Sequence, residues 1–343
     1  MSELTVVIPT HNRVEVLGDC LRAVAAATPD GETIEVVVVD DGSTDQTRQL
    51  LAKAYPQVRV LHFEHARGPA AARNAGIAAA DGPWCLIIND DTILDSAALG
   101  VFLAYRRGLA RREVSVIGNI APWPEQITAF EHWCSHGGSQ FTHARIPPER
   151  YEDAGEDQFV TSNILVERDL LLAHPFDESF RYARYEDREL GYRLARRSGH
   201  RIHYLPAARS YHCHRLGFAE WLGKWKTFGA AAIHFASLYP EDTELRRALS
   251  IERAERTESF SFAALLQQVS LLNDNHQRYF AVLEDDDQPI QPKIEQAFRA
   301  LQEFARLTYL RELLGLSARV DPQSGSTDRQ ALGRIRAALK PEV

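Results

Sequence analysis

The sequence predicts an α/β fold in which a mostly parallel sheet is flanked by helices. Short apolar runs rich in β-branched residues, typical of buried strands, cover 4–9, 34–39, 58–63 and 84–88. Helix-like segments between them lie near 13–27, 44–55 and 69–80. Strands that alternate with helices favour parallel pairing, because each helix carries the chain back to the edge where the strand began.

Local signals mark two of the helix starts. Ser43-Thr44-Asp45-Gln46 fits a capping box, which predicts that the second helix opens directly after Asp41. Pro69 follows Gly68 and is suited to the first position of the third helix, since a proline there loses no helical hydrogen bond.

The second half of the chain changes character along its length. We expect a helix near 96–110, a strand near 114–118, a strand over 159–166, a helix after Asp187 and a last strand over 201–205. Beyond about 215 the pattern is helical. Two helices each place apolar residues on one face: Phe262, Leu265, Leu266, Val269 and Leu272 in the first, and Ile294, Phe298, Leu301 and Phe304 in the second. We therefore expect a catalytic domain over 1–230 and a helical C-terminal extension over 231–343.

Composition narrows the class of protein. The 343 residues are 45% hydrophobic, and a net charge of −8 provides no basic field for nucleic acid. The four cysteines are scattered, without a Cys-x-x-Cys spacing. Neither a signal peptide nor an apolar run of membrane-spanning length is apparent. We expect a cytoplasmic protein, and peripheral contact with a membrane surface stays open.

Paired acids follow two of the predicted strands. Asp40 and Asp41 come directly after the second strand, and Asn89-Asp90-Asp91 follows the fourth. The carboxyl ends of strands are where open α/β sheets bind ligands. Adjacent carboxylates repel each other unless a positive charge lies beside them, and a divalent cation that carries a diphosphate meets this need. The pattern indicates a nucleotide-sugar site.

Four motifs in order carry a resemblance to a known family: Val7–Arg13, Val39–Asp45, Arg67–Gly76 and Asn89–Asp91. Their order and spacing resemble the family 2 glycosyltransferases, which have the Rossmann-like GT-A fold and invert the anomeric centre. The resemblance covers residues 4 to about 230, and implies that these segments form the donor pocket. Within the first segment it places Pro9, Thr10, Asn12 and Arg13 at the donor.

The resemblance also implies roles for the other donor residues. Asp40 accepts a hydrogen bond from a base such as uracil, although a turn or a helix cap would explain Asp40 and Asp41 as well. Arg67 and Arg73 bracket a helix start, where anions bind readily, and Arg73 is the stronger candidate.

Metal binding is expected at the fourth motif. The family's D-x-D motif begins here with Asn89, which has no charge, so Asp91 is assigned to the Mg²⁺ or Mn²⁺ ion while Asn89 and Asp90 face the donor. Family members with a histidine after the last strand use it as a further ligand, which implies His212 or His214, and His212 is preferred.

An acidic helix start supplies the catalytic candidates. The segment Glu186-Asp187-Arg188-Glu189-Leu190 resembles the family's E-D-x-D-L motif, in which Asp187 matches the general base, with Glu186 beside it. Glu189 stands where the family has a second Asp. A helix start with acids placed for the helix dipole is the simpler explanation of the same residues.

The resemblance implies a transfer of one sugar from a nucleoside-diphosphate sugar, with UDP favoured, to an acceptor hydroxyl in glycan, polysaccharide or glycoconjugate biosynthesis. The Q-x-x-R-W motif of processive relatives is absent, which favours single addition. The alternative is a non-catalytic sugar-nucleotide-binding or scaffold protein on the same fold. A homo-oligomer formed through the C-terminal helices is also open.

Overall fold

The structure is a computed structural model that describes residues 2–109, 114–123, 128–136, 146–213, 217–256, 260–282, 292–316 and 327–339. Contacts divide the chain into two units, one formed by Met1–Trp123 with His143–His214 and the other by Pro124–Thr142 with Arg215–Val343. The expected boundary near residue 230 falls inside helix α8 (Phe218–Leu238). The domain boundary near residue 230 stays a prediction.

An eight-stranded sheet forms the centre of the first unit, in the order β3-β2-β1-β4-β7-β6-β8-β5. The first four strands in this order are parallel, as expected: β1 (Leu4–Thr10), β2 (Glu35–Asp40), β3 (Arg59–His62) and β4 (Trp84–Ile88). The other four are β5 (Thr92–Leu94), β6 (Val114–Pro122), β7 (Asn163–Glu167) and β8 (Arg201–His212). Strand β7 is antiparallel to both β4 and β6, so the sheet as a whole is mixed.

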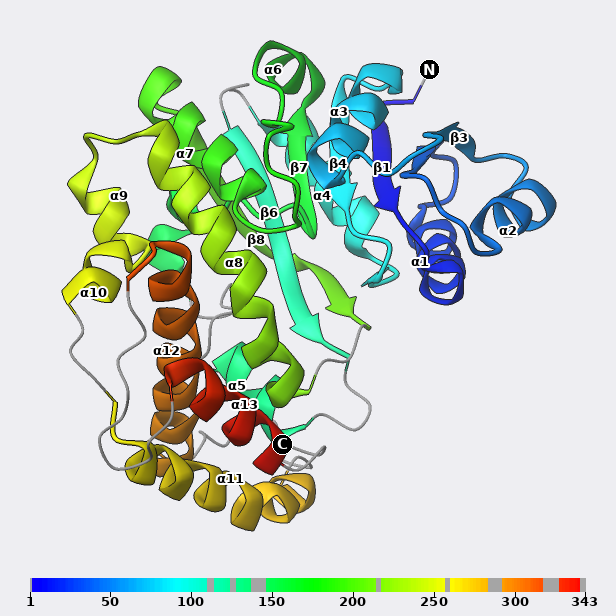
Figure 1. Cartoon of the computed structure of the whole chain (residues 1–343). Helices are drawn as coiled ribbons and strands as arrows, with labels where there is room; N and C mark the ends of the chain where they lie inside the picture. Colours follow the sequence, from blue (N-terminus) through cyan, green and yellow to red (C-terminus); the bar gives the residue numbers. More distant parts are fainter. Residues whose placement is uncertain are drawn as a thin grey trace. The chain divides into compact units, whose positions relative to one another are not determined.

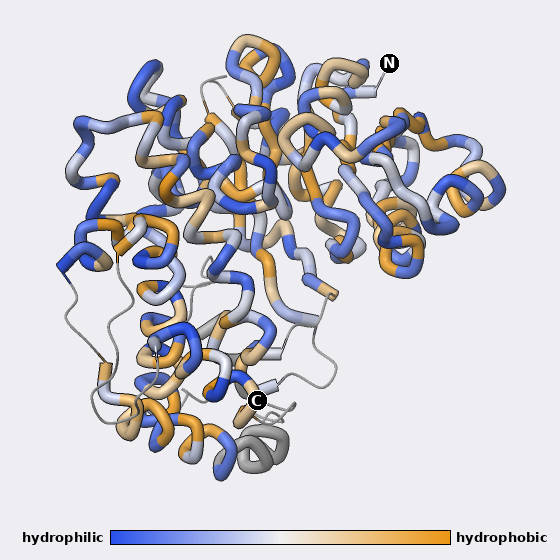
Figure 2. Tube along the Cα trace, in the orientation of Figure 1, coloured by the Kyte–Doolittle hydropathy of each residue, from blue (hydrophilic) through white to orange (hydrophobic). Residues whose placement is uncertain are grey.

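Helices of the first unit cover both faces of the sheet (Figure 1). They are α1 (Val14–Ala27), α2 (Thr47–Ala54), α3 (Pro69–Ala79), α4 (Ala98–Gly108), α6 (Arg168–Ala173) and α7 (Glu186–Ser198). Successive residues of a strand point to opposite faces, so Val6 and Ile8 join the cluster with α1 and α4, while Val7 joins the cluster with α3 and α7. Strands β1, β4 and β7 are buried along almost their whole length, whereas β3 at one edge of the sheet has no buried residue. Figure 2 shows the hydropathy of each segment in the same orientation.

The expected capping box of the second helix is wrong. Helix α2 starts at Thr47, with Gln46 rather than Ser43 at its N-cap and no side-chain cap. Asp45 instead accepts hydrogen bonds from the amide and the hydroxyl of Thr47, at 3.0 and 2.6 Å. Ser43 accepts a hydrogen bond from the Asn12 amide at 2.9 Å, so this serine joins two loops. Pro69 is the first residue of α3, as expected.

The second unit is helical in the part that the structure describes. Its helices are α5 (Ala129–His136), α8, α9 (Thr243–Ala248), α10 (Ile251–Arg256), α11 (Phe262–Val282), α12 (Pro292–Leu313) and α13 (Asp328–Ala338). Helix α12 packs against α8, α10, α11 and α13. The two predicted apolar faces are confirmed, because all of their residues except Leu266 are buried in one core. None of the helices in the described ranges combines the length and the hydrophobicity needed to cross a membrane.

Candidate functional site

The candidate donor residues come together where β1, β2 and β4 end. Thr10 closes β1 beside Asp40 at the end of β2, and β4 ends at Ile88, directly before Asn89. Parallel strands end at the same edge of the sheet, so segments about 80 residues apart meet here. The Thr10 hydroxyl donates a hydrogen bond to Asp90 Oδ2 at 2.8 Å.

Arg13 bridges the two acids that follow β4. Both terminal guanidinium nitrogens of Arg13 donate to Asp91 Oδ2 at 2.9 Å, and its Nε lies 3.8 Å from Asp90 Oδ1. Asp90 and Asp91 are only 6% and 4% exposed. Burial, followed by the negative charge of Asp91, raises the pKa of Asp90 to about 7. The Arg13 guanidinium therefore lies beside both buried carboxyl groups that follow β4.

His212, at the end of β8, also lies beside the Asp91 carboxylate. The antiparallel pairing of β5 with β8 places His212 opposite Thr92, the residue after Asp91. Its Nε2 lies 3.4 Å from Asp91 Oδ2. The backbone amide of Cys213 also donates to the Asp91 carbonyl at 3.0 Å. The two residues that we expected at the metal are thus neighbours.

The donor set around Asp91 fits a divalent cation that shares its shell with a phosphate. Asp91 Oδ1 is buried and has no hydrogen-bond partner within the described ranges, so it is available to a cation. Among those residues no group of three His, Cys, Asp or Glu side chains is arranged to hold a metal. Mg²⁺ is commonly bound by one or two protein ligands together with substrate phosphates and water. Asp91 and His212 would suit this arrangement.

Asp40 and Asp41 are both engaged with protein groups. Asp40 is fully buried, and its Oδ1 accepts from the Ser43 amide at 2.9 Å. Its Oδ2 lies 2.9 Å from His62 Nδ1 and 3.5 Å from Arg48 Nε. These partners stabilise the turn after β2 and occupy much of the carboxylate. The base-binding role of Asp40 stays a prediction.

Asp41 caps the segment before α3. Its two carboxylate oxygens accept from the backbone amides of Arg67 and Gly68, at 2.7 and 2.9 Å. This agrees with the structural explanation that we kept open for Asp41. Neither His62 nor Arg48 was among the candidates, since nothing in the sequence relates residues 62 and 48 to residue 40.

Pro9 and Asn12 shape the loop after β1. Pro9 lies in β1 opposite Val39. Asn12 has a positive φ of 53°, and its side-chain oxygen accepts from the Thr44 amide at 2.7 Å. Asn12 thereby connects the loop after β1 with the loop after β2. A donor contact by either residue is not tested by these contacts.

The two arginines at the start of α3 have different surroundings. Arg67 is 54% exposed in its side chain, pairs with Glu178 at 2.9 Å and lies over the ring of Phe63. Arg73 is buried and donates to Glu186 Oε1 at 2.6 Å and to Asn89 Oδ1 at 3.3 Å. Arg73 therefore links α3, the residue after β4 and the start of α7.

The acids at the start of α7 are held differently from one another. Glu186 is 2% exposed, and burial together with the nearby charge of Asp187 raises its pKa. Asp187 is more exposed, and its Oδ2 lies 3.3 Å from the Thr161 amide. Glu189 is paired with Arg193 within the helix, at 2.9 Å. Asp187 is the acid of the three that is partly exposed to solvent, and its contacts within the described ranges are hydrogen bonds from Thr161 and from the Arg188 amide.

Residues 161 and 162 connect the two acidic motifs, which the sequence did not reveal. Asn89 Nδ2 donates to the Ser162 hydroxyl at 3.0 Å, while the neighbouring Thr161 contacts Asp187. We expected a strand over 159–166, but β7 starts at Asn163. Thr161 and Ser162 lie in the turn before it, where polar side chains can face the site.

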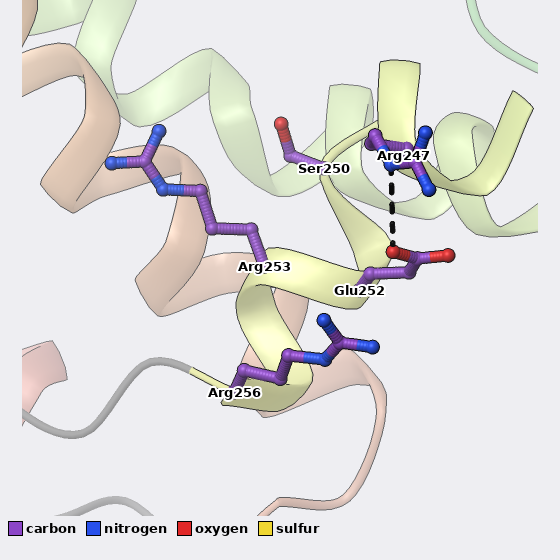
Figure 3. A pocket seen from close by; sticks show the side chains of 5 residues that line it. All are labelled: Arg247, Ser250, Glu252, Arg253 and Arg256. Atoms are coloured by element: carbon purple, nitrogen blue, oxygen red, sulfur yellow. Dashed lines mark ion pairs between the residues drawn. The ribbon is translucent and has the colours of Figure 1, made fainter. Parts of the chain in front are cut away.

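A separate pocket of about 550 Å³ lies in the second unit, lined by Arg247, Ser250, Glu252, Arg253 and Arg256 (Figure 3). The guanidinium groups in Figure 3 point in different directions. Arg247 lies 3.8 Å from Glu252, and Arg253 pairs with Glu303 at 2.9 Å. The pocket does not gather the predicted site residues.

Comparison with known sequences agrees with the geometry. Residues 5–119 match the model of the glycosyl transferase family 2. Succinoglycan biosynthesis protein ExoO of Rhizobium meliloti is 42% identical over 94 residues, which is 26% of each chain. A pre-mycofactocin glycosyltransferase of Mycobacterium tuberculosis is 28% identical over 250 residues, covering 70% of this chain and 49% of that protein. The chain thus spans about half the length of this relative and a quarter of the other.

Solved structures share the fold at low sequence identity. TarS 1–349 of S. aureus superposes with a TM-score of 0.52 at 18% identity, and 95% of each chain is covered. The mannosyltransferase PcManGT of Pyrobaculum calidifontis gives a TM-score of 0.52 at 18% identity, covering 90% of this chain and 87% of that one. The expected GT-A fold with a helical C-terminal region is confirmed. The match over residues 5–119 supports the predicted resemblance to the family 2 glycosyltransferases.

Proposed function

We propose that this protein transfers one sugar from a nucleoside-diphosphate sugar, with UDP as the favoured nucleotide, to a hydroxyl of an acceptor with inversion at the anomeric carbon. The observation that carries the proposal is the cluster of Asp90, Asp91, Arg13 and His212 beside Thr10, at the carboxyl edge of the sheet. Solved complexes of relatives point the same way: TarS 1–349 with UDP and with UDP-GlcNAc, and PcManGT with GDP-Man and Mn²⁺.

The donor would lie along the ends of β1, β2 and β4. Thr10 and Asp90 are hydrogen-bonded to each other at the position where a ribose would approach. A divalent cation held by Asp91 and His212 would neutralise the diphosphate as its bond to the sugar breaks. Arg73 is fixed by Glu186 and Asn89, so it presents a positioned positive charge close to the same segment.

Asp187 is the proposed general base. As the acceptor oxygen forms its bond to the anomeric carbon and the bond to the diphosphate breaks, the carboxylate takes the proton of the acceptor hydroxyl. The Thr161 amide and hydroxyl orient Asp187 Oδ2, at 3.3 and 3.5 Å. Glu186 is buried against Arg73, so its proposed contribution is to position that arginine.

The experiment is a panel of UDP-, GDP- and dTDP-sugars incubated with the protein, Mn²⁺ or Mg²⁺ and candidate glycan acceptors. Release of the nucleoside diphosphate and the anomeric configuration of the product are measured. Asp187→Asn is compared with Asp169→Asn, which alters an exposed acid of α6. We expect turnover and an inverted product, both lost in Asp187→Asn alone. Donor binding without turnover on any acceptor would favour the scaffold alternative.

Polysaccharide or glycoconjugate biosynthesis is the proposed setting, and the match to a succinoglycan biosynthesis protein supports it. The cytoplasmic location, the peripheral contact with a membrane and a homo-oligomer formed through the C-terminal helices stay predictions.

A further inference from the structure

Arg13 occupies the oxygen of Asp91 that also lies near His212. Both terminal nitrogens of its guanidinium bind the same oxygen, Asp91 Oδ2, at 2.9 Å. His212 Nε2 lies 3.4 Å from that oxygen as well. A cation shared by Asp91 and His212 would therefore lie within a few ångströms of a guanidinium, and two positive charges in a buried place repel each other strongly.

We propose that Arg13 is an exchangeable counter-ion of Asp91, which must leave this carboxylate when a divalent cation binds and then takes the diphosphate of the donor as its new partner. The inference rests on the proposed function, since it uses the same cation and donor. It assigns Arg13 a role that couples the two binding steps.

The surroundings of Arg13 allow such an exchange. Its side chain is 27% exposed, whereas that of Arg73 is 4% exposed and held from two directions. Arg13 stands at the N-cap of α1, where its backbone carbonyl accepts from the Leu17 amide while its side chain lies outside the helix, and the acids paired with that side chain are Asp90 and Asp91. A guanidinium in this place can turn from a carboxylate to a phosphate, because its fork of donors matches either group.

If Arg13 exchanges Asp91 for the diphosphate, it should weaken cation binding and strengthen donor binding. The guanidinium competes with the cation in the free protein, so it weakens cation binding there. Once the cation is bound, the displaced guanidinium adds a positive charge for the diphosphate, so it strengthens donor binding. A residue with a merely structural role would change both affinities in the same direction or neither.

The test measures Mn²⁺ affinity without nucleotide and UDP affinity at saturating Mn²⁺, both by calorimetry, on the full chain. Arg13→Gln removes the charge and keeps a polar side chain. The matched control is Arg59→Gln, which removes an exposed arginine paired with Glu35 at the opposite end of the parallel strands. Arg13→Gln should bind Mn²⁺ at least about tenfold more tightly and UDP at least about tenfold more weakly, as expected for one charged hydrogen-bonded contact. Arg59→Gln should leave both constants unchanged.

Unchanged or weaker Mn²⁺ binding by Arg13→Gln would overturn the inference, as would a lack of Mn²⁺ binding by every variant. If Mn²⁺ binds more tightly to the variant while no nucleoside diphosphate binds the wild-type protein, the cation exchange is upheld and the proposed donor fails. Should circular dichroism show that Arg13→Gln does not fold, Arg13→Lys takes its place, because it keeps the charge and loses the fork. Arg13→Lys should change both affinities in the same directions as Arg13→Gln but by less. If Arg13→Lys left both affinities unchanged, the exchange would be refuted.

Discussion

Arg73 and Glu186 form a buried ion pair that links α3 to the start of α7. The two side chains are 4% and 2% exposed, and their closest atoms are 2.6 Å apart. At an effective dielectric constant of 20, unit charges at this separation attract by ~6 kcal/mol. Most of this attraction offsets the cost of removing both groups from water. The net contribution of the pair is therefore small, while the loss of one partner is costly.

Replacing Arg73 by Met keeps most of the volume and removes the charge. Glu186 would then be left as a buried carboxyl group whose ion-pair partner is gone, and its Oε2 already has no hydrogen-bond partner within the described ranges. Removing one member of a buried pair costs about 3–5 kcal/mol. We expect the free energy of unfolding to fall by this amount in Arg73→Met. In the double variant Arg73→Met/Glu186→Leu, much of the loss should return, because no buried charge is left.

The assay is urea unfolding followed by circular dichroism at neutral pH. Arg67→Met is the matched control, since this arginine also stands at the start of α3 but pairs with Glu178 at the surface, where an ion pair contributes about 0–1 kcal/mol. Equal losses in Arg73→Met and Arg67→Met would refute the reasoning. A double variant Arg73→Met/Glu186→Leu that is less stable than Arg73→Met would refute it as well.

Three further predictions follow from other parts of the structure. Asp187→Asn should lower transfer by about two to four orders of magnitude with donor affinity little changed, and near-normal transfer in steady-state kinetics would exclude Asp187 as the base. Above about pH 4 the unfolded chain has released the Asp90 proton, whereas the folded protein, in which the pKa of Asp90 is raised to about 7, still holds it. The free energy of unfolding in chelator should therefore fall as the pH rises through about 7. Urea titrations should show a smaller fall in Asp90→Asn. Phe298→Ala, at a fully buried ring that stacks on Trp133 in the second unit, should cost about 3–5 kcal/mol in the same assay, and a loss below about 1 kcal/mol would contradict the packing.

Sequence patterns predicted the parts of the fold that depend on local periodicity. The first four strands and the apolar faces of α11 and α12 are where their hydrophobic patterns placed them. The position of β7 between β4 and β6 could not be predicted, because an antiparallel insertion depends on pairing between segments about 80 residues apart. The missed start of α2 has a local cause, since Asp45 competes with Ser43 for the role of polar partner.

For the candidate site, sequence reasoning named the acids and several of the residues around them, but not the contacts between them. Strand ends with paired carboxylates are visible in a sequence, whereas the contact of Arg13 with Asp91 joins residues 78 positions apart. Thr161 was hidden for another reason, because the strand expected over 159–166 begins only at Asn163. Asp40 lies at the end of β2 as expected, but the sequence did not predict that His62 and Arg48 would contact its carboxylate.

A calorimetric titration of UDP, GDP and dTDP into the protein is the decisive measurement for the proposed donor and cation site. It is run with Mn²⁺, with chelator, and on Asp91→Ala. We expect saturable binding of at least one nucleoside diphosphate with Mn²⁺. Binding should be much weaker in chelator and in Asp91→Ala, because the charge on the diphosphate then faces Asp90 without the cation. Equal affinity with and without chelator would contradict the role of the cation, and no binding of any of the three nucleotides would contradict the donor site itself.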